Sequence, residues 1–137
     1  MTKSIRLNSK GFSLVEVLVT VTIIGVISAI GIRSYNGYVK TAEESVAKNN
    51  LRSISLGQDI YFSERKRYYN SSYVSSINRV LFLGKKTLDS KSNYKYKIIR
   101  KSNKSGYIAY AIPKNKGYND FCIDDNGDLQ TGKCKHR

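Results

Sequence analysis

A long apolar run dominates the first third of the chain. Phe12 to Ile32 (FSLVEVLVTVTIIGVISAIGI) is 21 residues long and carries one charge, Glu16. As a helix rising about 1.5 Å per residue, this run reaches roughly 30 Å, the thickness of a bilayer's hydrocarbon core. The eleven residues before it contain three cations and no acid. The pattern predicts a membrane-spanning helix with a cytoplasmic N-terminus, so that Arg33 onward lies on the outer side of the membrane.

The helical pattern continues beyond the apolar run. Apolar residues recur at near-helical spacing between charged ones, at Tyr35, Val39, Ala42, Val46, Leu51, Ile54 and Tyr61. A continuous helix from Phe12 to about Glu64 would have 53 residues and would be roughly 80 Å long. Because a small domain cannot bury such a helix, we expect its first half to lie in a membrane or among other subunits.

The rest of the chain predicts a loop followed by strands. Residues 65–93 are polar and rich in serine and tyrosine, which indicates a connecting loop. Four stretches with strand patterns follow, namely Asn93–Lys101, Tyr107–Pro113, Phe121–Ile123 and Asp128–Thr131. Asn126-Gly127, between the last two, is a strong hairpin signal. The predicted fold class is α+β, with the second half of the long helix packed on an antiparallel sheet of about four strands.

Glu16 is the one charge within the apolar run. A carboxylate at the centre of a membrane helix costs about 3 kcal/mol on insertion scales, so it calls for a partner or a function. The stretch Lys10 to Ile30 (KGFSLVEVLVTVTIIGVISAI) resembles the class III leader and N-terminal helix of a type IV pilin. This resemblance implies the type IV pilin fold. The corresponding parts are a leader (1–11), a filament-core helix half (12–32), an amphipathic helix half (33–64), a connecting αβ-loop (65–93) and a sheet with a disulfide-bounded C-terminal region (94–137).

The resemblance also implies a processing and assembly sequence. Prepilin peptidase would cut after Gly11 and methylate the new N-terminus at Phe12, and Glu16 would pair with the terminal amine of a neighbouring subunit. The implied partners are other pilins, prepilin peptidase, and the pilus assembly platform with its ATPase. The implied locations are the bacterial inner membrane before assembly and an extracellular filament afterwards. Many relatives carry a proline where this chain has Arg33, so whether the helix melts near Gly25 stays open.

The chain has two cysteines, Cys122 and Cys134, on either side of the last predicted hairpin. In an oxidising compartment a disulfide is favoured over free thiols or a metal pair, and it would contribute about 3 kcal/mol. The resemblance assigns such a bond to the C-terminal region of pilins. Asp124, Asn126 and Asp128 begin like a calcium loop, but Leu129 stands where that loop requires glycine. We therefore expect no metal site and no cofactor.

The chain is strongly basic, with 24 Lys or Arg against 10 Asp or Glu. Such a surface suits phosphate contacts, and the strand pleat would place Lys95 and Lys97 on one face with Tyr94 and Tyr96 on the other. Exposed tyrosines would stack on bases. The candidate DNA-binding residues are Arg65, Lys66, Arg67, Lys85, Lys86, Lys95, Lys97, Arg100, Lys101 and Lys104. The alternative explanation is a coding bias that enriches lysine without a ligand.

These observations favour a structural subunit of a type IV pilus, polymerised through its apolar helix. One alternative is a minor pilin that binds DNA for uptake, mainly by contacting the sugar-phosphate backbone of the DNA. Another is a pseudopilin of type II secretion, which a calcium requirement would favour. An enzyme is excluded because His136 is the only histidine and no nucleophile, base and orienting group cluster together.

Overall fold

The computed structural model describes residues 11–85, 87–102 and 105–132, with the main chain alone at Arg33. The first ten residues of the predicted leader, and Lys86, Lys104 and Cys134, lie outside the described residues. The chain divides into two units, Met1–Tyr38 and Val39–Arg137, which are treated separately below.

Helix α1, Leu14–Arg65, is a single helix of 52 residues and confirms the predicted long helix. Its first turn is preceded by Ser13, whose backbone N–H lies 3.4 Å from Oε2 of Glu16. Serine followed three residues later by glutamate is a common sequence signature of a helix start. In the first unit the apolar side chains are exposed, and this part of α1 is long and apolar enough to cross a membrane.

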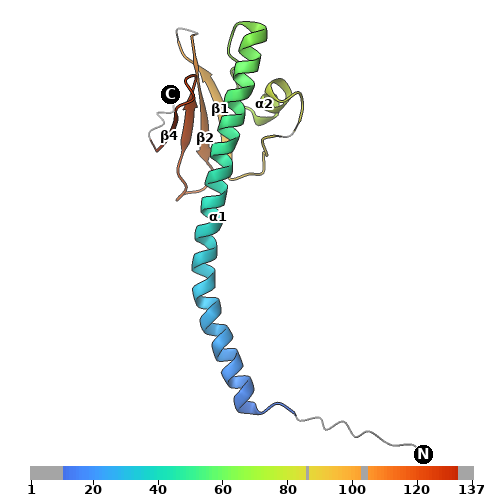
Figure 1. Ribbon diagram of the computed structural model, residues 1–137, viewed down its shortest axis with the longest axis vertical. Coiled ribbons are helices and arrows are strands. Elements are labelled where there is room, and N and C mark those ends of the chain that lie inside the picture. Colours follow the sequence, from blue (N-terminus) through green and yellow to red (C-terminus); the bar gives the residue numbers. More distant parts are fainter. Residues whose placement is uncertain (1–10, 86, 103–104, 133–137) are drawn as a thin grey trace, which may run out of the picture. The chain divides into compact units, whose positions relative to one another are not determined.

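The second unit contains a four-stranded antiparallel sheet in the order β1-β2-β3-β4. Its strands are β1 (Tyr94–Arg100), β2 (Tyr107–Pro113), β3 (Phe121–Asp124) and β4 (Leu129–Thr131). Each strand pairs with the next in the chain, as expected for successive hairpins (Figure 1). The predicted α+β fold is therefore confirmed, with strand ends within one residue of the expected ones.

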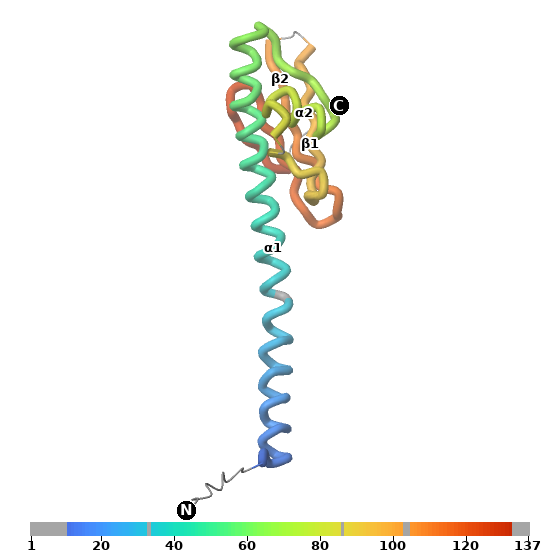
Figure 2. Tube along the Cα trace, turned by 90° about the vertical axis from the view of Figure 1, so that its right-hand side faces the viewer, coloured from blue at the N-terminus to red at the C-terminus, as the bar shows by residue number. Residues whose placement is uncertain are grey.

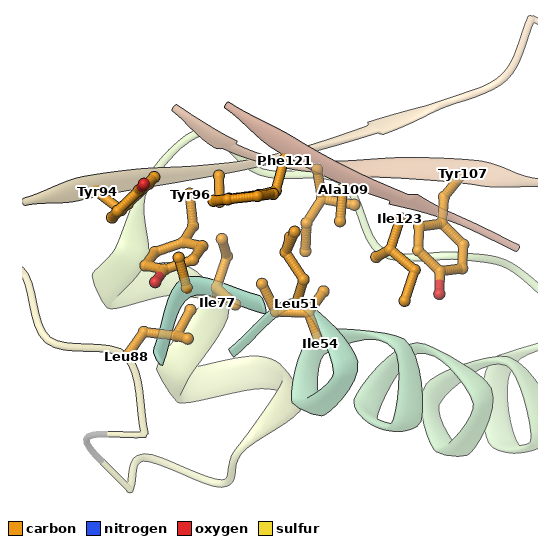
Figure 3. Packing of buried hydrophobic residues seen from close by; sticks show 13 residues of the cluster. Leu51, Ile54, Ile77, Leu88, Tyr94, Tyr96, Tyr107, Ala109, Phe121 and Ile123 are labelled. Carbon is orange, nitrogen blue, oxygen red and sulfur yellow. The ribbon is translucent and has the colours of Figure 1, made fainter. Parts of the chain in front are cut away.

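The core lies between one face of the sheet and the helices (Figure 3). From α1 it receives Ala47, Leu51 and Ile54, all fully buried. The sheet contributes alternate residues of each strand, including Tyr96 from β1 and Phe121 from β3. The predicted apolar face of the helix is wrong at Val46, which is 53% exposed, whereas its neighbour Ala47 is buried. Leu51 and Ile54 of the predicted stripe are buried as expected, so the stripe that packs on the sheet differs from the predicted one at this position.

A second helix, α2 (Val74–Leu81), interrupts the predicted connecting loop. The serines of this segment resemble a loop sequence and hide its helical periodicity. One face of the helix is formed by Val74, Ile77, Asn78 and Leu81. Ile77 and Asn78 are buried, and Val74 and Leu81 pack against the core. α2 lies beside β1 (Figure 2), and an isolated bridge between Ser71 and Ile98 fixes the chain just before the helix to that strand.

Candidate nucleic-acid interface

Positive charge is concentrated in one continuous part of the chain. Residues 65–101 contain eleven Lys or Arg and one acid, Asp89, whereas residues 34–64 contain three cations and four acids. β2 has no charged residue, and three acids, Asp124, Asp125 and Asp128, follow or end β3. Because β1 and β4 are the two outer strands, the sheet is basic at the β1 edge and acidic toward β4.

The lysines of β1 point away from the core, as the pleat predicts. Lys95 is exposed and Lys97 is half-buried, opposite Ile112 and Tyr110 of β2. Alternate residues of a strand are about 6.6 Å apart, so the two lysines are neighbours on the outer face of β1. Both lysines therefore present positive charge on the same side of β1.

Tyr94 and Tyr96 are not among the tyrosines that could stack on bases, because both side chains are core residues with exposures of 2% and 1%. The Tyr94 hydroxyl donates to the Asn119 carbonyl oxygen at 2.9 Å, and the Tyr96 hydroxyl accepts a hydrogen bond from Asn50 Nδ2 at 2.8 Å. Burial raises the pKa of both phenols. These rings stabilise the sheet and take no part in binding a base.

Arg65, Lys66 and Arg67 form an exposed basic turn at the end of α1. Lys66 has a positive φ of 55° and donates its backbone N–H to the Phe62 carbonyl, which turns the chain out of the helix. The ring of the following Tyr68 stacks on Phe62 at 4.6 Å.

Aromatic contacts place this basic turn near the end of β1. The Tyr68 ring lies 5.0 Å from that of Tyr107, which is the strand partner of Arg100. Burial raises the pKa of Tyr107 to about 12, and its hydroxyl is hydrogen-bonded to Ser55 Oγ. The exposed side chain of Arg100 and the basic turn thus belong to the same end of the unit (Figure 1).

Lys101 differs from the other candidates because it is paired. Its ammonium contacts the carboxylate of Asp125, in the turn after β3. The hydrogen bond to Asp125 raises the pKa of Lys101. Burial alone would raise the pKa of Asp125, but Lys101 and backbone N–H donors lower it below its ordinary value. This ion pair joins two turns, so Lys101 is less available to a phosphate than Lys95.

Two further cations belong to this surface and were missed in the candidate set, Arg79 on α2 and Lys91 in the loop before β1. Both are exposed, as is the predicted Lys85 between them in sequence. Neither residue belongs to a recognisable sequence motif. The signal that would have identified both is the excess of cations over acids in residues 65–101. We use the name basic surface for the exposed or half-buried cations Arg65, Lys66, Arg67, Arg79, Lys85, Lys91, Lys95, Lys97 and Arg100.

The predicted processing residues lie at the start of α1. Gly11 and Phe12 are exposed and precede the helix, and Glu16 is in its first turn. The Gly11–Phe12 bond therefore lies outside regular secondary structure. The distance between Glu16 and another subunit is not a property of this single chain, so its pairing stays a prediction.

The C-terminal hairpin holds the remaining predicted residues. Cys122 is buried in β3, and the proposed bond to Cys134 stays a prediction because Cys134 is outside the described range. Asp124 Oδ1 accepts hydrogen bonds from the N–H groups of Asn126 and Asp128, at 3.0 and 3.1 Å. Among the described residues, no three His, Cys, Asp or Glu side chains are grouped to hold a metal ion. The aspartate of this turn thus stabilises the turn itself.

Two family models match the chain. The one described as prokaryotic N-terminal methylation motif matches residues 6–32. The one described as type IV minor pilin ComP, DNA uptake sequence receptor, matches residues 34–125, which are 92 of the 137 residues. Its match includes the whole of the basic surface.

A curated relative is the type IV major pilin protein PilA of Myxococcus xanthus (strain DK1622). It is 37% identical over 60 residues, which are 44% of this chain and 27% of the relative. The chain therefore matches about a quarter of the length of that protein, and the similarity does not extend to the rest of PilA.

Proposed function

Since this chain belongs to the type IV pilins, in the family described as type IV minor pilin ComP, DNA uptake sequence receptor, we propose that it is a minor pilin that captures DNA for uptake. As a type IV pilin it is a non-enzymatic protein of membrane and pilus that is processed by prepilin peptidase. We further propose that the cut falls between Gly11 and Phe12 and that Glu16 pairs with the amine of a neighbouring subunit. The family match favours DNA capture, the alternative above, over a purely structural filament subunit.

The observation that carries this proposal is the segregation of charge. A coding bias toward lysine would distribute cations along the whole chain, but residues 65–101 hold eleven cations and one acid. The parts of the chain on either side of this segment are close to balanced, with three cations against four acids in residues 34–64. Such a local excess supports a surface that attracts a polyanion.

The geometry supports contact with the DNA backbone. Lys95 and Lys97 present ammonium groups along β1, and the basic turn with Arg100 extends this row at one end of the unit. α2, which packs beside β1 (Figure 2), adds the exposed Arg79. Phosphate contacts of this kind give affinity that falls steeply with salt, because each neutralised phosphate releases counterions.

The test is a binding titration of the full-length chain, purified in mild detergent, with a fluorescent DNA duplex over a range of salt concentrations. The variant Lys95→Gln/Lys97→Gln removes two cations of the basic surface. The matched control Arg52→Gln/Lys116→Gln removes two exposed cations that lie elsewhere, on α1 and in the loop after β2. If both lysines contact phosphates, the slope of log affinity against log salt becomes shallower by about 2 in the first variant.

Three results would contradict the proposal. They are the absence of binding at low salt, an unchanged salt slope for the β1 variant, and an equal loss of affinity in the control. The last result would show that net charge alone determines binding, which is the behaviour of a basic protein without a DNA-binding surface.

A role as a filament subunit is the second candidate, and the exposed apolar side chains of residues 14–32 support it. The two functions are compatible, because a minor pilin must itself enter the filament to display a DNA-binding surface. Antibody labelling of cell-surface pili distinguishes them by abundance: labelling along the shaft supports a major subunit, and sparse labelling supports a minor one.

A further inference from the structure

A pocket of about 800 Å³ opens within the basic surface, beside α2. One side is a face of α2, and the other is the loop that leads to β1. Its lining includes Val74, Ser75, Arg79, Leu88, Ser90 and Lys91. The size lies within the range of pockets that bind small organic ligands.

The walls of this pocket are held in place by hydrogen bonds. Asn78, buried on α2, donates from Nδ2 to the Leu88 carbonyl at 2.8 Å and accepts the Leu88 N–H at 2.9 Å. On the loop, the Lys91 N–H donates to Asp89 Oδ1, and Lys114 Nζ donates to the Ser90 carbonyl, both at 2.8 Å. The pocket is therefore formed before any ligand binds, so little affinity is lost in ordering it.

The lining combines an apolar surface with cations and hydroxyl groups. Leu88, 1% exposed, lies in the wall with the partly buried Val74, whereas Arg79 and Lys91 are exposed. Asp89 is the one acid among the described residues of the lining, and its Oδ1 already accepts a hydrogen bond. A matching ligand combines a weakly polar body with an anionic group, and a nucleotide has both.

We propose that this pocket binds one unpaired nucleotide of the captured DNA, with its base against Val74 and its flanking phosphates beside Arg79 and Lys91. The proposal builds on the DNA binding proposed above and specifies its substrate. A paired base presents only its edges in the grooves, so a base must leave the stack to enter a concave site. The pocket thus favours DNA with overhangs, frayed ends or gaps over an intact blunt duplex.

The experiment compares two DNA ligands, a blunt duplex and the same duplex with a short single-stranded overhang. The readout is the ratio of their affinities for the full-length chain in detergent. Ser75→Glu places a carboxylate in the pocket lining, on an exposed position of α2. Ser72→Glu makes the same charge change at an exposed residue outside the lining and serves as the matched control.

The wild-type chain is expected to bind the overhang duplex about five-fold more tightly than the blunt duplex, which corresponds to about 1 kcal/mol. Ser75→Glu should bring this ratio to one, and Ser72→Glu should preserve it. Free deoxyadenosine monophosphate, added as a competitor to the wild-type chain, should also lower the ratio without releasing the blunt duplex. This second measurement needs no substitution in α2.

A wild-type ratio of one, or a ratio that survives both Ser75→Glu and the mononucleotide, would overturn the pocket assignment while leaving DNA capture in place. Binding of neither duplex would overturn DNA capture itself and the pocket assignment with it. The two proposals therefore fail in distinguishable ways.

Discussion

Gln58, a fully buried residue of α1, forms two hydrogen bonds with the main chain of Tyr69. Its Nε2 donates to the Tyr69 carbonyl and its Oε1 accepts the Tyr69 N–H, both at 2.8 Å. The Gln58 amide thereby satisfies the main-chain N–H and carbonyl of Tyr69, as a neighbouring strand would do in a sheet. Because the basic turn of Arg65, Lys66 and Arg67 lies between the two residues in sequence, this pair fixes both ends of the turn.

Replacing Gln58 with alanine should lower the free energy of unfolding by about 2–3 kcal/mol, because two buried main-chain groups of Tyr69 lose their partners. Chemical denaturation measures this change. Asp59→Ala, at the exposed neighbouring position, should stay within about 0.5 kcal/mol of the wild type. DNA affinity should also fall in the Gln58 variant although no charge is removed. Equal stabilities for the two variants would contradict the role assigned to Gln58.

Gly106 is required because it has no side chain. A Cβ atom at this position would lie 2.5 Å from Oδ1 of Asp125. Gly106→Ala should therefore displace the carboxylate from Lys101 and lower stability by about 1–3 kcal/mol, as overpacking does. Thermal unfolding checks this, with Gly37→Ala as the control. Gly37 is helical with open space around it, so alanine there should have no such cost.

The ion pair between Asp125 and Lys101 predicts a dependence of stability on pH. The pKa of Asp125 is lowered from its ordinary value of 3.8 in the folded chain. A carboxyl with a lowered folded pKa stabilises the protein above its unfolded pKa, and this stabilisation is lost as the pH falls through the folded pKa. Asp125→Asn should therefore be less stable than the wild type at neutral pH, and the difference should shrink below about pH 4. A stability difference between the wild type and Asp125→Asn that stays the same from neutral pH down to about pH 2 would argue against this ion pair.

Glu16 is predicted to act in assembly and not in membrane insertion. Glu16→Ala should insert into the membrane normally and lose incorporation into fibres, because the terminal amine of the neighbouring subunit then lacks an anionic partner. Glu16→Gln keeps a hydrogen-bond acceptor near the Ser13 N–H but removes the charge, and it should fail in the same way. Fractionation of membranes and of sheared pili measures both steps. Normal fibres from either variant would exclude the charge pair.

The two cysteines are predicted to form the one disulfide that this sequence allows. Cys134→Ser should lower the free energy of unfolding by about 2–5 kcal/mol, as the loss of a native disulfide does in small exported domains. Thiol quantitation of the unfolded wild-type chain, before and after reduction, provides the direct check. Two reactive thiols before reduction would contradict the bond.

The sequence predicts the elements of this fold well because each has a strong local pattern. Leu14–Arg65 has helical periodicity, and the four strands alternate or flank a clear turn. α2 was missed because its serines resemble a loop, and its apolar residues form a face only when the core is present. The alternation along β1 correctly predicted that Lys95 and Tyr94 lie on opposite faces of the sheet. Which of the two faces is buried depends on where α1 packs, and α1 is far from β1 in the sequence.

The functional surface was only partly predictable for the same reason. The basic turn and the β1 lysines follow from local charge, and the excess in residues 65–101 is visible in the sequence. The residues that position this surface are Gln58 and Asn78, two amides whose partners lie 11 and 10 residues away. Nothing local distinguishes a buried amide of this kind from an exposed one. The pairing of Lys101 with Asp125 is likewise a tertiary contact that no local pattern indicates.

The outer position of β1 in the sheet has a consequence for solubility. A strand at a sheet edge exposes main-chain groups that can pair with a strand of another molecule, and charged side chains are a common protection against such aggregation. Within the described residues, the bridge between Ser71 and Ile98 covers only one point of that edge. Lys95 and Lys97 therefore protect the edge from self-association, in addition to their proposed contact with DNA, so apolar replacements there would promote aggregation.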